Sequence, residues 1–365
     1  MISRQQPSGP TYHRIVSLHD ANARESVARL VERLGGRVGR FLPLVNALCA
    51  DFDDPNGHHA LLNHPQVAFV TDDVELKISL PHLGRGPRRE HEPQAVPWNI
   101  WRIGAPDAWS VTRGKGVVIG VIDTGIALDH PDLNGNLAAG YNALRPGRSA
   151  HDDNGHGSMV AGVIAALDNE IGVVGVGPRL AVAPVKALDA NGSGRLSAIV
   201  DALQWCLENR IPIVNLSIGL PGRSVVLHQA VERAYERGLF LVAAVGNGGP
   251  RADSVEHPAR LPFVVGVGAS TPENRVAAFS ARGEGIDLTA PGVEIRSTHP
   301  GGYRVISGTS IAAPHVSAVA GLILAANGPL PPAEIRHRLL KSGRRLAGES
   351  LSAQGRGLVD ARLAL

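Results

Sequence analysis

The chain has 365 residues, which is long enough for one large domain and a second, smaller one. Its 43 glycines, 26 prolines and 4% aromatic residues are typical of a compact, turn-rich α/β protein rather than a disordered chain. The net charge of +3 comes without a dense basic run interleaved with aromatic residues, so nucleic acid is not an expected partner.

The sequence carries no visible targeting or membrane signal. Residues 1–7 lead into no apolar segment, which predicts no signal peptide in the sequence as given, and a secreted protein would need an upstream leader. We see no apolar run of membrane-spanning length and expect no membrane partner. Cys49 and Cys206 lie far apart, which favours free thiols over a disulfide. Nothing requires more than a monomer.

The first 80 residues are predicted to form a small α+β unit. The patterns predict strands over 12–18, 40–48 and 67–70, a helix over 23–34 and a short helix around 60–62. The partly inferred order β-α-β-β-α-β suits a split βαβ sandwich. Residues 81–93 are rich in Pro, Arg, Gly and Glu without periodicity, so we expect an exposed linker there.

Beyond the linker, apolar runs alternate with helical patterns. Residues 116–122 form a continuous β-branched run that is typical of a strand buried on both faces. Further strands are predicted over 181–188, 211–217, 239–245 and 263–267, with helices between them over 157–167, 195–208 and 224–237. This alternation predicts an α/β fold in which helices cover both faces of a parallel sheet. Functional residues are then expected at the carboxyl ends of the strands.

Three polar residues lie at boundaries between predicted elements. Asp123 ends the 116–122 run, and His156 lies between two glycines ahead of a helical segment. Ser310 follows a small-residue turn and precedes an apolar run of helical length. If a hydroxyl at a helix N-terminus attacks a carbonyl, the free backbone N–H groups there stabilise the oxyanion that forms. The alternatives are that Ser310 caps a buried helix and that His156 is structural.

Together these residues lie in segments that resemble the three signatures of the subtilisin-like serine proteases. The segments are Val-Ile-Asp-Thr-Gly at 121–125, Asn-Gly-His-Gly-Ser at 154–158 and Gly-Thr-Ser-Ile-Ala-Ala-Pro-His at 308–315. The order Asp, His, Ser is also that family's order. The resemblance implies a three-layer α/β/α catalytic domain over 94–365. More loosely, it implies that residues 1–80 are an inhibitory, ferredoxin-like propeptide domain.

The resemblance assigns a role to each catalytic position. Ser310 would attack the peptide carbonyl, His156 would take its proton and pass it to the leaving amine, and Asp123 would hold the imidazole. Asn247 matches the side chain that donates to the oxyanion. Its alternative role is an ordinary turn residue in a glycine-rich loop.

A substrate is expected to add as a strand between two glycine-bearing segments. The residues concerned are Gly192, Ser193 and Gly194 on one side and Ser217, Ile218 and Gly219 on the other. Glu256 falls at the floor of the primary specificity pocket, where a carboxylate would favour Arg or Lys before the cut. Alternatively, Glu256 points to solvent or pairs with Arg260.

The resemblance also implies a structural calcium ion bound by the loop at 167–173. The implied ligands are the side chains of Gln94, Asp132 and Asn169 and the backbone carbonyls of Leu167, Ile171 and Val173. An all-oxygen set of this kind suits calcium. The alternative is an ordinary surface turn.

The expected function is therefore a serine endopeptidase that acts on proteins and peptides and is made as a zymogen inhibited by its own propeptide. The resemblance places the processing boundary near 92–94, where Pro93 would hinder cleavage, so a cut further upstream stays open. The alternative function is a latent or inactive relative that binds peptides or proteins.

Overall fold

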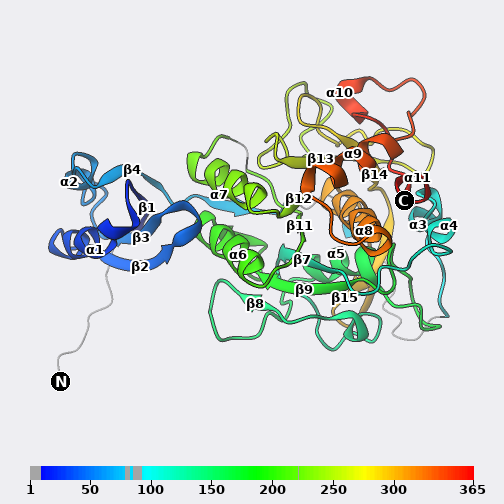
Figure 1. Cartoon of the computed structure of the whole chain (residues 1–365), viewed down its shortest axis with the longest axis horizontal. Coiled ribbons are helices and arrows are strands. Elements are labelled where there is room, and N and C mark those ends of the chain that lie inside the picture. The colour runs from blue at the N-terminus through cyan, green and yellow to red at the C-terminus, as the bar shows by residue number, and fades with distance from the viewer. Residues whose placement is uncertain (1–9, 79–82, 85–92, 221) are drawn as a thin grey trace.

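The computed structural model describes residues 10–78, 83–84, 93–220 and 222–365; most of the predicted 81–93 linker lies outside them. The chain forms a small N-terminal sheet unit and a larger unit built on a second sheet. Figure 1 shows the small unit, in blue, beside helices α6 (Leu196–Glu208) and α7 (Val225–Glu236) of the larger one. Cys49 in the small unit and Cys206 in the larger one are free, as expected.

The small unit has the predicted order of helices and strands. Its elements are β1 (Tyr12–Leu18), α1 (Arg24–Arg33), β2 (Arg37–Leu42), β3 (Ala47–Phe52), α2 (His59–Leu62) and β4 (Val67–Asp72). The strands form an antiparallel sheet in the order β2-β3-β1-β4. Val27 and Val31 of α1 are fully buried against this sheet, which explains the helical spacing of apolar residues there.

One predicted strand of this unit is wrong. Residues 40–48 do not form a single strand, because the 3-10 turn η2 (Pro43–Val45) separates β2 from β3. Asn46 closes the turn with a φ of 51°, a left-handed conformation that asparagine tolerates. The turn looks like a strand in the sequence because Leu44 and Val45 are buried in the core of the larger unit.

The larger unit is built on a seven-stranded parallel sheet in the order β14-β13-β12-β11-β7-β9-β8. Five of its strands are the predicted ones: β7 (Val118–Asp123), β9 (Ala181–Lys186), β11 (Ile213–Leu216), β12 (Phe240–Ala244) and β13 (Val264–Ser270). The edge strands β8 (Tyr141–Asn142) and β14 (Leu288–Pro291) were not predicted, because they are too short to form an apolar run. The confirmed strands bring Asp123 to the carboxyl edge of the sheet.

Helices cover both faces of this sheet and make three layers. Helices α6 and α7 pack on one face, whereas α5 (His156–Ala165) and α8 (Thr309–Asn327) pack on the other. Figure 1 shows α8, in orange, on the opposite side of the strands from α6 and α7, in green. The fold is therefore the expected three-layer α/β/α arrangement.

Helix α8 corrects the expectation that no apolar run reaches membrane-spanning length. It has 19 residues with a mean hydropathy of 1.6, but 89% of its apolar window is buried inside the protein. Its apolar character is that of a core helix surrounded by the sheet and α5. The predicted helix start at Ser310 is confirmed, because α8 begins one residue earlier.

The remaining elements are short, apart from one 11-residue helix. They are η1 (Ala21–Ala23), β5 (Glu75–Lys77), β6 (Leu83–Gly84), α3 (Trp98–Arg102), α4 (Ala105–Ala108), η3 (Asn134–Asn136), β10 (Ser193–Arg195), β15 (Ile295–His299), β16 (Gly302–Ile306), α9 (Pro332–Ser342), α10 (Leu351–Gln354) and α11 (Ala361–Ala364).

Candidate active site

Asp123 and His156 form a buried hydrogen-bonded pair. Asp123 is the last residue of β7, and His156 is the first residue of α5. The His156 Nδ1–H donates to the Asp123 carboxylate, with distances of 2.8 and 2.9 Å to its two oxygens. Asp123 is 0% and His156 2% exposed. The bond fixes the imidazole with Nδ1 protonated, which leaves Nε2 as the atom able to accept a proton.

The two glycines that flank His156 allow this approach. Gly155 has a φ of 108°, a conformation that other residues rarely adopt, and it turns the chain into α5. At Gly157 an added Cβ would lie 3.1 Å from the Asp123 Cβ and would overlap the carbonyl of Gly125. The Gly-His-Gly pattern is therefore what brings α5 against the end of β7.

A second buried carboxylate, Asp152, stabilises this corner of the site. It accepts hydrogen bonds from the Thr124 hydroxyl at 2.8 Å, from the Gly155 N–H at 2.9 Å and from the Ser158 hydroxyl at 2.6 Å. Burial alone would raise the pKa of Asp152, but the bonds from the Ser158 hydroxyl and from the Gly155, Asn154 and Ser158 N–H groups outweigh it and lower the pKa. The sequence analysis did not identify this role, although Asp152 lies only two residues before the Asn-Gly-His-Gly-Ser segment at 154–158.

The charged form of His156 is stabilised despite its burial. Burial disfavours the imidazolium, but the Asp123 carboxylate outweighs this effect, and the pKa of His156 is raised, with a further contribution from Asp152. An imidazole in this setting accepts a proton readily from a neighbouring hydroxyl. The site therefore contains a base that is oriented by a carboxylate.

Ser310 is the second residue of α8, and its backbone is fixed by an interruption of the helix. Pro314 has no N–H with which to bond the Ser310 carbonyl one turn earlier. The Ser217 hydroxyl donates to that carbonyl instead, at 2.6 Å, and is itself held by the Asn215 amide at 2.8 Å. This arrangement attaches the start of α8 to the end of β11.

The Ser310 Oγ and the His156 Nε2 are both buried, and neither has a hydrogen-bond partner in the described part of the chain. Buried polar atoms are usually paired, so these two are exceptions of the kind that marks functional sites. Catalytic hydrogen bonds are often long before a substrate binds.

Asn247 lies beside the start of α8. Its Oδ1 accepts from the Thr309 N–H at 3.0 Å and from the Thr309 hydroxyl at 3.1 Å. These two bonds fix the orientation of the amide, so its Nδ2 faces away from Thr309. Sequence reasoning did not identify Thr309 as the residue that orients Asn247.

The two predicted substrate segments are brought together around a strand of the chain itself. β5 pairs antiparallel with β10, with Lys77 opposite Ser193 and Leu76 opposite Gly194. Lys77 also bridges Gly219 on the other side, and the Ile78 N–H donates to the Gly192 carbonyl at 2.9 Å. The alternation of apolar and polar residues over 74–78 is a strand signal that could have revealed β5.

Glu256 points into the pocket next to Ser310 rather than to solvent. A Cβ on Gly219 would overlap its carboxylate, and a Cβ on Gly246 would lie 2.8 Å from its Cδ. The pocket retains only about 10 Å³ of free volume and is lined by Ser217, Ile218, Gly219, Ala244, Gly246, Asn247, Glu256, Thr309 and Ser310. Arg260 instead pairs with Asp253 at 2.7 Å. Burial raises the pKa of Glu256.

The six residues predicted to bind calcium converge at one loop. The Gln94 Nε2 lies 2.7 Å from the Leu167 carbonyl and 3.5 Å from three further oxygens, those of Asn169, Ile171 and Val173. The Oδ1 of Asp132 is buried with no partner among the described residues, whereas its Oδ2 accepts from the Val173 N–H at 3.1 Å. The described residues contain no cluster of three or more His, Cys, Asp or Glu side chains that could bind a metal.

A parallel α/β sheet whose carboxyl edge presents a buried Asp–His pair, with a serine at the start of a helix packed against the helix that begins at the histidine, is typical of serine hydrolases. Residues 114–357 match the model of the subtilase family. The chain is 41% identical to M-protease of Shouchella clausii (strain KSM-K16) over 312 residues, 85% of this chain and 77% of that protein. It is 44% identical to Subtilisin Savinase of Lederbergia lenta over 273 residues, 74% of this chain and 99% of that protein. Subtilisin amylosacchariticus of Bacillus subtilis subsp. amylosacchariticus is 37% identical over 340 residues, 92% of this chain and 84% of that protein.

The chain therefore belongs to the subtilase family and is a subtilisin-like serine endopeptidase. Its protein and peptide substrates follow from that class.

Proposed function

We propose that Asp123, His156 and Ser310 are the catalytic triad of this protease. His156 Nε2 takes the proton of the Ser310 hydroxyl as its Oγ attacks the peptide carbonyl. The imidazolium is stabilised by Asp123, and its proton then goes to the leaving amine, so an acyl-enzyme forms. Water hydrolyses the acyl-enzyme by the same proton transfers in reverse order. The Asp123–His156 hydrogen bond, with Nε2 left to accept, supports these roles most directly.

Asn247 Nδ2 and the Ser310 backbone N–H are proposed to donate to the oxyanion of the tetrahedral intermediate. The Ser310 N–H is among the first N–H groups of α8, which have no partner within the helix. Thr309 holds the Asn247 amide so that its donor needs no reorientation during the reaction.

We infer further that residues 1–80 are an inhibitory propeptide and that 94–365 are the catalytic domain. β5 occupies the edge where an extended substrate would pair, and Leu76 and Ile78 are 1% and 7% exposed. Beyond residues 79–82, β6 pairs with β16, and β16 ends four residues before Ser310. We therefore propose that self-cleavage falls between Ile78 and Leu83, upstream of the boundary near 92–94. Mass spectrometry of the fragments identifies the cut, and a first cut at 92–94 would contradict this assignment.

Glu256 is proposed to select Arg or Lys before the cleaved bond. Its carboxylate lies in the pocket beside Ser310 and has no ion pair in the described residues. Because little free volume remains, an incoming side chain must displace the carboxylate or bond to it. A guanidinium or ammonium group would pair with it, whereas an apolar side chain would leave a desolvated charge.

The Glu256→Gln variant tests this preference with peptides that differ only in having Arg or Phe before the cut. The ratio of kcat/KM for Arg over Phe should fall about tenfold to a hundredfold, because the amide removes a charged hydrogen bond. Since burial raises the pKa of Glu256, the wild-type ratio should also rise as pH increases through that pKa. Asp253→Asn, which breaks only the neighbouring Arg260 pair, is the control. An unchanged ratio in Glu256→Gln would exclude the preference.

The loop at 167–173 is proposed to bind a structural calcium ion. The unpartnered, buried Asp132 Oδ1 and the carbonyls gathered around the Gln94 amide fit a hard cation that takes oxygen ligands. With the ion bound, Gln94 would present its amide oxygen in place of its nitrogen. The ion would stabilise the folded chain by mass action and would take no part in the chemistry.

Chelation should therefore lower the melting temperature. In the Ser310→Ala chain, which removes self-digestion from the measurement, calcium at about a hundred times its Kd should raise Tm by about 3–5 °C over the value in chelator. Asp132→Asn should remove most of that difference. Equal melting temperatures with calcium and with chelator would argue against the site.

A latent relative that binds peptides is the second candidate. Strand β5 pairs with β10, where a substrate would pair. This observation favours a latent protein as long as the chain is uncut. Incubation of the full chain with casein distinguishes the two, because a self-processing protease releases casein fragments and its own N-terminal unit. A peptide-binding relative releases neither.

A further inference from the structure

We propose that Lys186 is a positioning residue that couples the substrate-pairing edge at β10 to the loop carrying His156. The inference rests on the proposed triad and on β10 as the edge that pairs with substrate. It concerns how binding of an extended peptide is transmitted to the catalytic base.

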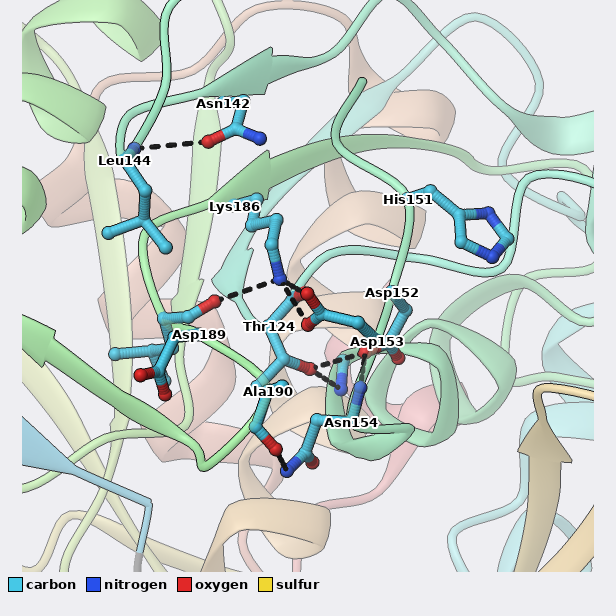
Figure 2. A network of polar contacts seen from close by, with 12 residues as sticks. Thr124, Asn142, Leu144, His151, Asp152, Asp153, Asn154, Lys186, Asp189 and Ala190 are labelled. Atoms are coloured by element: carbon cyan, nitrogen blue, oxygen red, sulfur yellow. Dashed lines mark hydrogen bonds and ion pairs between the residues drawn. The ribbon is translucent and has the colours of Figure 1, made fainter. Parts of the chain in front are cut away.

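Lys186 is a buried cation at the end of an otherwise apolar strand. It is the last residue of β9, lies opposite Asp123 in the sheet register and is 5% exposed. Its ammonium donates to the Thr124 carbonyl at 2.5 Å, to the Asp153 carboxylate at 2.6 Å and to the Leu188 carbonyl at 3.0 Å. All three donors of the ammonium are therefore used, as Figure 2 shows at its centre.

Each acceptor belongs to a different segment of the site. Thr124 directly follows Asp123, and Asp153 lies three residues before His156. Leu188 begins the loop that leads into β10. A single ammonium therefore links the carboxylate, the imidazole and the substrate edge through short stretches of backbone.

A second link runs parallel to the first. The Asn154 Nδ2 donates to the Ala190 carbonyl at 2.9 Å, and the Asn154 Oδ1 accepts from the His156 N–H at 3.1 Å. Figure 2 shows Asn154 and Ala190 in contact below Lys186. The His156 backbone is thus connected to the 188–192 loop by Asn154 as well as by Lys186.

The 188–192 loop is itself held firmly. The Asp189 carboxylate accepts from the Asn191 and Ser193 N–H groups, both at 2.9 Å, and the Asp189 N–H donates to the Ser193 carbonyl at 2.8 Å. A peptide that pairs with β10 therefore contacts a segment that is connected by hydrogen bonds to the loop carrying His156, and its binding can stabilise the position of that loop. Binding energy far from the cut bond can in this way raise kcat rather than only lower KM.

The Lys186–Asp153 ion pair is not explained by a contribution to the stability of the fold. A buried ammonium must be fully paired to avoid a large desolvation cost, and apolar side chains of similar volume are often at least as stable. Asp153 is half exposed, with 51% of its side chain accessible. A positioning role explains why a lysine occupies a strand end where an apolar residue would pack.

The test compares kcat for two amide substrates with the same residue before the cut, a tetrapeptide that reaches β10 and a single-residue amide that does not. In the self-processed wild-type enzyme, kcat should be higher for the tetrapeptide. Lys186→Met keeps the length of the side chain but removes the three bonds, and the kcat ratio of long to short substrate should fall about tenfold or more. Lys186→Arg should recover part of the ratio.

Arg336→Met is the matched control. Arg336 also binds one carboxylate and two carbonyls, those of Asp287 at 2.7 Å, Val264 at 2.9 Å and Pro262 at 3.2 Å, but it lies on α9 and outside the cleft. Its loss should lower Tm and leave the kcat ratio unchanged.

An unchanged ratio in Lys186→Met would overturn the coupling, as would an equal fall in Arg336→Met. If Lys186→Met does not accumulate folded, Asp153→Asn serves instead, because it keeps the carbonyl bonds and removes only the charge pairing. A reduced ratio in that variant supports the proposal, and an unchanged one overturns it. A wild-type enzyme that hydrolysed neither substrate would overturn the triad proposal, and this inference with it.

Discussion

Replacing Ser310 with alanine is expected to lower kcat for peptide hydrolysis about a millionfold, the size of loss that subtilisins show when the same serine is removed. The physical reason is that the variant lacks the hydroxyl that is proposed to give its proton to the His156 Nε2. The imidazole would remain bonded to Asp123, with nothing to deprotonate except water. The variant chain should also stay at full length, because self-cleavage needs the same nucleophile.

Initial rates on a chromogenic tetrapeptide and the mass of the purified chain measure both effects. Ser352→Ala, on the exposed surface of α10, is the matched serine-to-alanine control and should process and hydrolyse as the wild type does. Far-UV circular dichroism shows whether Ser310→Ala is folded. A folded Ser310→Ala chain that kept more than a small fraction of the wild-type activity would contradict the assignment of Ser310 as the nucleophile.

Replacing Asn247 with leucine is expected to lower kcat about a hundredfold to a thousandfold with little change in KM. This range is the one that subtilisins show for the corresponding side chain. The amide contributes only when the carbonyl oxygen becomes an oxyanion, so its loss should affect the transition state more than the bound substrate. Steady-state kinetics on one tetrapeptide separates kcat from KM.

Thr309 provides a graded control for the same donor. Thr309→Val removes the hydroxyl that bonds the Asn247 Oδ1 but keeps the backbone N–H bond, so a smaller loss is expected. Thr309→Ser keeps both bonds and should be close to wild type. A rise in KM without a fall in kcat for Asn247→Leu would assign Asn247 to substrate binding instead.

The sequence predicted the position of a functional residue where that residue lies at the end of a strand or the start of a helix with a clear apolar pattern. The run that becomes β7 predicted a buried parallel strand, and the end of that strand placed Asp123 at the carboxyl edge of the sheet. The small-residue turn before α8 likewise predicted a helix that begins near Ser310. Local chain geometry was sufficient for these residues because each lies within one or two positions of an element boundary.

The contacts that hold those residues in place were not predictable in the same way. Lys186, Asp152 and Thr309 act through partners that only the fold brings near them, and no spacing in the chain indicates such a partner. The prediction of a single strand over 40–48 was wrong for a related reason. The turn that begins at Pro43 packs against the larger unit, which buries a segment that would otherwise be polar. Tertiary contacts changed the local pattern in that case.

Labelling with a serine-directed fluorophosphonate, followed by peptide mass spectrometry, tests the proposed triad most directly. In the self-processed enzyme the adduct should lie on Ser310, and His156→Ala should abolish it because the hydroxyl then lacks its base. An adduct on another residue, or peptide hydrolysis that continues without any label on Ser310, would contradict the account.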